Sequence, residues 1–327
     1  MVKVLEHDIY GQMGKRLWKR LSIGKRGKQN TGPSTRDDVN KGAYRQGPQP
    51  DTRSLQDAVM TLVFSAPVRF TGLLASRLLH LLPTPSRPSR YLRGYIASLH
   101  SASMGKQATL LMRTVSGYST ESLEIHSEES LLHIIVIPGN PGIASYYKDF
   151  VEAVYQLLEG QASITGKDHK LSTDWEHGRK FSLEEQIAHK VDFIKQEFQN
   201  NEVPIILVGH SIGSYICLEV FKRLPQQVKY VIGLYPFLTL NKNSFKQSII
   251  GLIARSSVIS AAISYFASLL RSLPISVQDN MVRQFLGKTW SATAVAVTCS
   301  HLLQYHTIRN MLFLAMTEFE KVLLSYL

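Results

Sequence analysis

Runs of apolar residues recur along residues 104–327 in two alternating forms. Short continuous runs bounded by turn residues, at 131–137 (LLHIIVI), 203–209 (VPIILVG) and 228–237 (VKYVIGLYPF), are typical of buried strands. Helical patterns lie between these runs. Strands that alternate with helices at this spacing predict an α/β fold with a mostly parallel sheet.

Two of the intervening segments carry the signals of helix ends. The segment 146–160 (YYKDFVEAVYQLLEG) closes at Gly160, which favours a helix C-terminus there. The segment 182–201 begins with Ser182 and Glu185, which have the spacing of a capping box. Four apolar residues of this segment share one helical face: Ile187, Val191, Ile194 and Phe198. Both segments are therefore predicted to be helices.

A long apolar segment, residues 244–277, follows the last predicted strand at the place where such folds insert a cap. Between Ser248 and Leu270 the only charged residue is Arg255. By length it could span a membrane, but four serines weaken that interpretation: Ser256, Ser257, Ser260 and Ser264. A pair of cap helices that can lie on a lipid surface is the favoured prediction, with ordinary buried helices as the other alternative.

Residues 1–103 differ from the rest of the chain in charge. They contain 17 Lys and Arg against 6 Asp and Glu, whereas residues 104–327 contain 20 against 19. Residues 1–55, rich in Gly, Gln, Pro and basic side chains, predict a disordered arm. The run Val59–Leu82 is interrupted by proline and arginine, which favours an amphipathic or transit-like segment over a spanning helix. Of the net charge of +12, +11 thus belongs to an extension without a recognisable nucleic-acid-binding module, and no nucleic-acid partner is predicted.

The cysteine content limits the chemistry that the chain can support. Cys217 and Cys299 are too few for a disulfide framework, and no Cys and His cluster with zinc-ligand spacing is present in the sequence. We predict neither a metal nor a cofactor.

The pentapeptide GHSIG, residues 209–213, follows one predicted strand and opens a helix. In this context G-x-S-x-G is typical of a nucleophile elbow, a turn so tight that Gly209 and Gly213 cannot carry side chains. Ser211 would then project at a helix N-terminus, where the dipole stabilises negative charge. Ser211 is the candidate nucleophile, and a solvated serine in an ordinary glycine-flanked turn is the alternative.

A second turn, IPGNPG at residues 137–142, follows an earlier strand. Serine hydrolases complete their oxyanion hole with an N–H group from such a loop and with the N–H of the residue after the nucleophile. Gly139 and Asn140 are the candidates in the loop, and Ile212 is the residue that follows the serine. An ordinary Pro-Gly turn is the alternative.

Several longer strings occur along the chain in this order: IPGNPG, DWEHGRKFSLEEQIAHKVDFIK, VPIILVGHSIGSYICLE, GLYPFL and CSHLLQYHTIRNMLFLAMTEFEK. Through these strings the chain resembles the plant-type lipid droplet-associated hydrolases from about Met104 to Lys321. The resemblance implies an α/β-hydrolase fold with a helical cap and a location on lipid droplets and the endoplasmic reticulum. It also implies serine ester hydrolysis of sterol esters or other neutral lipids in lipid storage.

The resemblance further implies a catalytic Asp and His beyond the AMTEFEK segment, where this chain closes with VLLSYL. We therefore expect a C-terminally incomplete hydrolase fold without those two residues. The other candidates have ordinary interpretations. They are His210, packed beside the nucleophile; His301 and His306, on different helical faces; Asp192, solvated on a helix; Asp279, in a polar connector; and His169, a doubtful match to a His-containing stretch of the family.

Two functions follow from this combination of features. The first is a droplet-associated serine hydrolase that uses Ser211 with Ile212 and the Asn140 loop. The second is a catalytically silent protein that docks peripherally on the droplet surface through residues 244–277. A serine without a base is a poor nucleophile at neutral pH, which is the reason for the second hypothesis.

Overall fold

The computed structural model describes residues 106–170, 179–199, 203–240, 245–286 and 290–324. The predicted N-terminal arm and the run Val59–Leu82 lie outside the described residues.

The sheet has six strands in the order β1-β2-β4-β3-β5-β6. Strands β3, β4, β5 and β6 are parallel to one another, and the hairpin β1–β2 joins β4 in antiparallel orientation. The strand bounds are β1 Thr109–Val115, β2 Tyr118–Ile125, β3 Leu132–Ile137, β4 Ala162–Lys167, β5 Ile205–His210 and β6 Val228–Leu234. The α/β-hydrolase fold predicted from the sequence, with its mostly parallel sheet, is confirmed.

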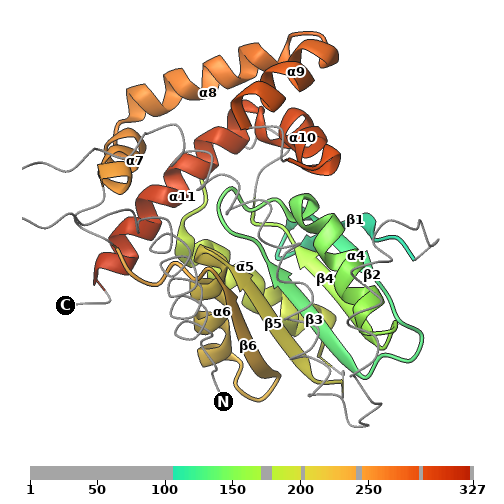
Figure 1. Cartoon of the computed structure of the whole chain (residues 1–327). Helices are drawn as coiled ribbons and strands as arrows, with labels where there is room; N and C mark the ends of the chain where they lie inside the picture. Colours follow the sequence, from blue (N-terminus) through green and yellow to red (C-terminus); the bar gives the residue numbers. More distant parts are fainter. Residues whose placement is uncertain (1–105, 171–178, 200–202, 241–244, 287–289, 325–327) are drawn as a thin grey trace, which may run out of the picture.

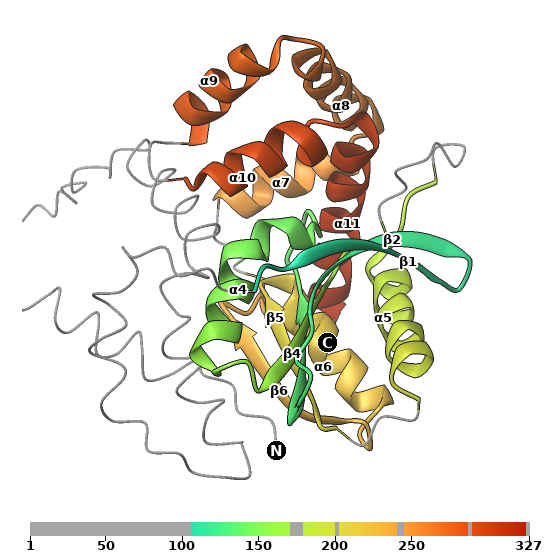
Figure 2. The ribbon, with the colours of Figure 1, turned by 90° about the vertical axis from the view of Figure 1, so that its right-hand side faces the viewer.

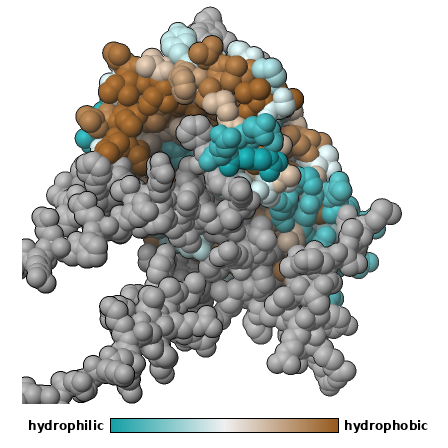
Figure 3. Space-filling model, turned by 45° about the horizontal axis from the view of Figure 1, so that its top comes forward, coloured by the Kyte–Doolittle hydropathy of each residue, from teal (hydrophilic) through white to brown (hydrophobic). Residues whose placement is uncertain are grey.

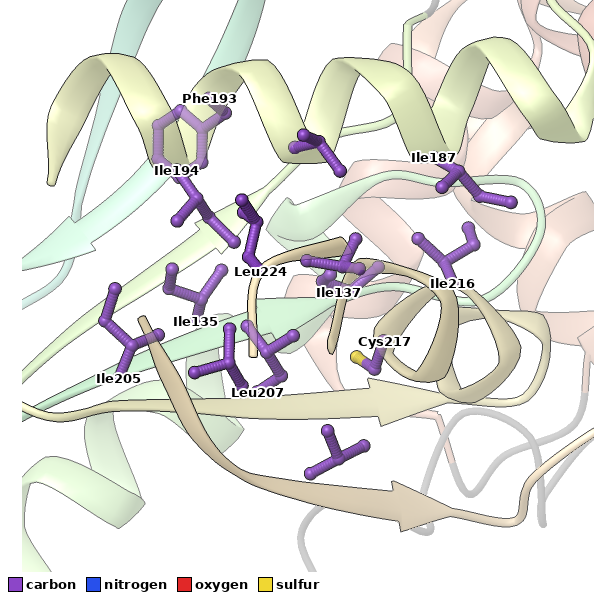
Figure 4. Packing of buried hydrophobic residues seen from close by; sticks show 14 of the residues in the cluster. Ile135, Ile137, Ile187, Phe193, Ile194, Ile205, Leu207, Ile216, Cys217 and Leu224 are labelled. Atoms are coloured by element: carbon purple, nitrogen blue, oxygen red, sulfur yellow. The ribbon is translucent and has the colours of Figure 1, made fainter. Parts of the chain in front are cut away.

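The central strands β3, β4 and β5 are buried along their whole length because both faces of the sheet are covered. Successive residues of β3 point to opposite faces: Ile134 and Val136 join the core beneath α4 (Lys148–Leu157), whereas Ile135 and Ile137 join the opposite core. The opposite core lies beneath α5 (Leu183–Glu197) and α6 (Ile212–Arg223). Figure 2 shows α4 on one side of the sheet and α5 and α6 on the other, and Figure 4 shows the packing of the second core.

The predicted helix ends are present. Ser182 caps α5: its side chain accepts from the Glu185 N–H, and the Glu185 carboxylate accepts from the Ser182 N–H, which is a complete capping box. Beyond α4, Gly160 adopts a φ of 73°, the left-handed conformation that glycine adopts without steric cost.

A bundle of helices covers the carboxyl edge of the parallel strands, and Figure 1 shows it above the sheet. The elements are α7 Phe245–Arg255, α8 Ser257–Arg271, α9 Ile275–Leu286, α10 Ala292–Val297, the π-turn η2 Thr298–Leu302 and α11 Tyr305–Leu324. The helix pair predicted for residues 244–277 is present as α7 and α8, which meet at Ser256. The predicted polar connector at Asp279 is wrong, because this residue lies within α9, where neighbouring apolar residues extend the helix.

Among the described helices, only α7 and α8 come close to the length and hydrophobicity of a membrane-spanning segment. Among the described residues, no single helix is both long and apolar enough to cross a bilayer. Helices α7 and α8 satisfy the length and composition criteria only as a pair, and this pair is bent by 95°.

Candidate functional site

Ser211 lies at the turn between β5 and α6 and is half-buried. Its φ of 53° and ψ of −121° are sterically unfavourable for a residue with a Cβ. The backbone is fixed from the next strand, since the Ser211 N–H donates to the Leu234 carbonyl at 3.0 Å and the Phe237 N–H donates to the Ser211 carbonyl at 3.1 Å. Neighbouring structure therefore maintains the strained turn, and the strain is typical of functional sites.

Close backbone approach explains the two glycines beside Ser211. A Cβ on Gly209 would lie 2.4 Å from the Gly213 carbonyl oxygen, and a Cβ on Gly213 would lie 2.3 Å from the Ile137 carbonyl oxygen. Neither neighbour can move away, because both are backbone atoms of the elbow or of β3. The elbow geometry thus requires glycine at both positions.

The loop after β3 lies against the elbow. A Cβ on Gly139 would lie 3.0 Å from the Ser211 Cβ and 3.0 Å from His210 Nδ1. The Gly139 N–H itself donates to the Tyr147 hydroxyl at 3.1 Å. Gly139 therefore gives the loop its close approach to the elbow, while its N–H is already engaged.

Two backbone N–H groups next to Ser211 are free. Among the described residues, the N–H groups of Asn140 and Ile212 donate to no other group. Asn140 stands beside Gly139 in the loop, and Ile212 is the first residue of α6. Ile212 and the loop that carries Asn140 both adjoin Ser211, and unpaired backbone donors beside a nucleophilic hydroxyl can stabilise an oxyanion.

His210 is packed beneath the loop, as the sequence predicted for the residue that precedes the serine. It is 4% exposed, and its Nδ1 lies 2.7 Å from the Tyr147 hydroxyl. That hydroxyl accepts from Gly139, so its own proton is directed to Nδ1, and His210 carries its remaining proton on Nε2. Burial lowers the pKa of His210 to about 4, so the ring is neutral at physiological pH.

The other titratable candidates have partners of their own. Asp192 accepts from the Ser116 hydroxyl at 2.7 Å, and Asp279 pairs with Arg283 at 2.7 Å. His301, in η2, lies 3.3 Å from a carboxylate oxygen of Glu121, which raises the pKa of the histidine. These contacts leave all three side chains occupied away from Ser211.

Two further histidines make no hydrogen bond to Ser211 among the described residues. His306 stands at the start of α11, with its ring edge-on to Tyr305. His169 is fully buried, and a Cβ on Gly142 would lie 2.5 Å from its side chain. Burial holds the pKa of His169 well below its usual range. Within the described part of the chain, the Ser211 hydroxyl makes no hydrogen bond to any side chain.

Glu318, on α11, is a residue near the site that sequence reasoning missed. It is 5% exposed, and its carboxyl interacts with the side chain of Asn140, while the Asn140 Nδ2 donates to the Met311 carbonyl at 2.9 Å. Burial raises the pKa of Glu318 to about 8. The available signal was an acidic residue two helical turns from Met311, on the same face of an otherwise apolar stretch.

The described residues offer no metal site. No group of three or more His, Cys, Asp or Glu side chains there is arranged to hold a metal ion. The chemistry available at this edge of the sheet is that of a hydroxyl and two backbone donors.

Comparison with known proteins gives a consistent family assignment. The lipid-droplet associated hydrolase family model matches residues 130–325. The chain is similar to the lipid droplet-associated hydrolase of Dictyostelium discoideum, with 30% identity over 202 residues, which are 59% of this chain and 64% of that protein. It is 29% identical over 208 residues to the protein of the same name from Gallus gallus, covering 58% of this chain and 63% of that protein. The chain thus spans less than two thirds of these relatives.

Solved structures with a similar backbone include the epoxide hydrolase CorEH, with a TM-score of 0.49 and 14% identity over 66% of this chain and 75% of that chain. Another is the haloalkane dehalogenase DbeA from Bradyrhizobium elkani, with a TM-score of 0.47 and 15% identity over 64% and 69% of the two chains.

Proposed function

The chain belongs to the lipid-droplet associated hydrolase family, and we propose that it is a serine hydrolase that cleaves carboxylic esters of neutral lipids at the droplet surface. The observation that carries the proposal is the strained turn at Ser211, which is followed by the unpaired N–H of Ile212 and packs against the Gly139–Asn140 loop, where the Asn140 N–H is also unpaired. Sterol esters and acylglycerols are the substrate classes we propose, with a role in lipid storage on droplets and at the endoplasmic reticulum.

The proposed reaction is acyl transfer through the serine. Ser211 Oγ attacks the ester carbonyl carbon, and the resulting oxyanion accepts hydrogen bonds from Asn140 N–H and Ile212 N–H. The C–O ester bond then breaks, the alcohol leaves with a proton, and water releases the fatty acid from the serine. A base must accept the Ser211 proton, and none of the described side chains holds that position in the resting structure.

The outer face of the cap supports access to a substrate dissolved in a lipid phase. Large apolar side chains of α7, α8, α9 and the turn between α8 and α9 are exposed: Ile249, Ile250, Leu252, Val258, Ile259, Tyr265, Phe266, Leu269, Leu273, Ile275 and Val277. We call this set the cap surface. Figure 3 shows it as a continuous hydrophobic area.

Acids are rare around the cap surface. No Asp or Glu occurs between residues 245 and 278, which contain Lys246, Arg255 and Arg271, and the first acid beyond this range, Asp279, pairs with Arg283 at 2.7 Å. An exposed apolar face of this extent marks an interaction site. With basic residues at its edge, it suits the phospholipid monolayer around a droplet, on which the protein would sit peripherally. The cap would then stand between the lipid phase and Ser211.

A fluorophosphonate probe tests the hydrolase proposal. Full-length wild-type protein and the Ser276→Ala control, which alters an exposed serine of α9, are expected to be labelled. The Ser211→Ala variant is expected to lose the label completely while its circular dichroism spectrum stays unchanged. Folded wild-type protein without label, or equal labelling of Ser211→Ala, would contradict the proposal.

A second candidate function is that of a catalytically silent droplet-surface protein. It is favoured by one observation, the absence of any described side chain in hydrogen-bond contact with the Ser211 hydroxyl. Folded protein that binds droplets through the cap surface but is not labelled by the probe would support this function over the hydrolase.

A further inference from the structure

The Tyr147 side chain connects the loop after β3 to the elbow. Its hydroxyl accepts a hydrogen bond from the Gly139 N–H at 3.1 Å and lies 2.7 Å from His210 Nδ1. Gly139 belongs to the loop, and His210 is the residue before Ser211. One hydroxyl thus bridges the segment that carries Asn140 and the segment that carries Ser211.

Tyr147 is itself fixed by the core. It is the last residue of the short 3₁₀ helix η1 (Ala144–Tyr147), it is buried, and it belongs to the hydrophobic cluster beneath α4 together with Phe150 and Val151. Its ring meets the His210 ring edge-on, with 5.8 Å between the two centroids. A closely packed ring of this kind can hold the groups that bond to its hydroxyl in fixed positions.

The two partners of the hydroxyl match its hydrogen-bonding capacity. A tyrosine hydroxyl has one proton to donate and can also accept. The Gly139 N–H can only donate, so the proton of the Tyr147 hydroxyl goes to His210 Nδ1. Burial raises the pKa of Tyr147 and lowers the pKa of His210, so both side chains are neutral at physiological pH and both hydrogen bonds of the bridge are made.

The bridge also determines which N–H of the loop is available. The Gly139 N–H is engaged with Tyr147, and the Gly139 carbonyl accepts from the Gly142 N–H at 2.6 Å. The Asn140 N–H is unpaired among the described residues. Gly139 packs on the elbow, since a Cβ at this position would lie 3.0 Å from the Ser211 Cβ. A shift of Gly139 would therefore move the loop relative to the nucleophile.

We propose that Tyr147 is a positioning residue for the reaction of Ser211: its hydroxyl holds the loop against the elbow, occupies the Gly139 N–H and leaves the Asn140 N–H as the oxyanion donor of the loop. Tyr147 acts through Gly139 and His210 and takes no part in the bond changes. This inference rests on the proposed function, since it assigns the loop a role in the same reaction.

The first test compares Tyr147→Phe with the control Tyr146→Phe in the full-length protein. Each substitution removes one hydroxyl, and that of Tyr146 bonds instead to Thr298 Oγ1 of η2, at 2.9 Å. Fluorophosphonate labelling rates are measured as a function of probe concentration. In Tyr147→Phe the maximal rate should fall about tenfold, less than the loss of about 10²- to 10³-fold that follows complete removal of an oxyanion donor. The probe concentration at half-maximal rate should not change, because the loop acts on the transition state, and Tyr146→Phe should keep the wild-type values.

A second measurement is independent of catalysis. Amide hydrogen exchange of the Gly139 N–H reports on its hydrogen bond to Tyr147. Exchange should be faster in folded Tyr147→Phe and unchanged in Tyr146→Phe. The ¹⁵N signal of His210 Nδ1 should likewise change only in Tyr147→Phe, because there the nitrogen loses its donor.

Variants of His210 test the same bridge from its other end, and they replace Tyr147→Phe if that variant does not fold. The side-chain oxygen of the asparagine in His210→Asn can accept the Tyr147 proton, whereas His210→Leu leaves this proton without an acceptor. The maximal labelling rate of His210→Leu should therefore be lower than that of His210→Asn, at the same half-maximal probe concentration.

The possible results separate this inference from the proposed function. Equal maximal rates in wild type and Tyr147→Phe, or in the two His210 variants, would overturn the inference, and so would equal slowing of Tyr147→Phe and Tyr146→Phe. If the label is still lost in Ser211→Ala, the proposed hydrolysis stands in each of these cases. Absence of labelling in folded wild-type protein would instead overturn the proposed hydrolysis, and the role of Tyr147 with it.

Discussion

Helices α6 and α8 use apolar residues in opposite ways. In α6 the large side chains of Ile212, Ile216 and Val220 are fully buried between the sheet and α5. In α8 the fully buried residues are small, Ser260, Ser264 and Ala267, and Ile263 is partly buried beside them. The other large apolar side chains include the exposed Val258, Ile259, Tyr265, Phe266 and Leu269. The serines that weakened a membrane-spanning interpretation of the sequence are therefore part of the face through which α8 packs on the body of the protein.

This difference separates two uses of the hydrophobic effect. The apolar surface of α6 is already removed from water on folding, so it contributes to the free energy of unfolding. The apolar surface of α8 remains in water, with Val258, Phe266 and Leu269 exposed by 76%, 61% and 66%. It can contribute free energy only when another phase or molecule covers it. Substitutions in the two helices should accordingly change two different measured quantities.

The largest expected effect concerns droplet binding. The double variant Phe266→Ser, Leu269→Ser removes two large side chains from the cap surface, each worth about 1.5–3 kcal/mol on full burial. Binding to artificial triacylglycerol droplets in a flotation assay should weaken by roughly 10²- to 10⁴-fold. The melting temperature should stay close to that of wild type, since both side chains are exposed in the free protein.

A matched control is available on β1, the strand at one edge of the sheet. Leu110 and Met112 of β1 are 42% and 56% exposed and lie outside the cap surface. The Leu110→Ser, Met112→Ser variant should bind droplets like wild type. Equal loss of binding in both double variants would show that the cap surface is not the docking face.

The next effect concerns the core beneath α6. Ile216→Ala leaves a cavity in the packed cluster of Figure 4 and should lower the free energy of unfolding by about 2–5 kcal/mol. Urea unfolding followed by circular dichroism measures this change. Val258→Ala, on the exposed face of α8, is the comparison and should stay within about 0.5 kcal/mol of wild type. Similar losses in the two variants would contradict the contrast between the helices.

The smallest effect compares two serines with the same local role. Ser182 caps α5 and Ser256 caps α8, each accepting from the backbone N–H three residues on. Ser182→Ala should reduce the free energy of unfolding by about 1 kcal/mol, because α5 packs on the core. Ser256→Ala should instead raise amide hydrogen exchange in the first turn of α8 with little change in global stability. A larger global loss from Ser256→Ala would show that the cap unfolds together with the sheet.

Much of the fold and part of the site could be predicted because their determinants are local. The turn at Ser211 could be predicted because its geometry requires glycine at positions 209 and 213, and both glycines are visible in the sequence. The Asn140 loop follows from its place after a predicted strand. The prediction that Asp279 lies in a connector was wrong because a charged residue is also tolerated on an exposed helical face. There Asp279 pairs with Arg283, four residues further along the helix.

Contacts between distant segments could not be predicted in this way. The Tyr147 hydroxyl accepts a hydrogen bond from the Gly139 N–H and makes another with His210. Helix α11 brings Glu318 into contact with Asn140, which lies 178 positions earlier in the chain. Neither contact has a periodic or motif signature. Each depends on how helices outside the sheet pack over its carboxyl edge.

The sequence by itself determined the alternation of strands and helices, the glycine-flanked turn at Ser211 and the Pro-Gly loop after β3, because these depend on hydrophobic period and on backbone sterics over a few residues. The tertiary structure decided which face of α8 meets water, which loop N–H remains free, and which acid lies buried beside Asn140. These features depend on long-range packing, where the free energy of a side chain is set by neighbours that are remote in sequence.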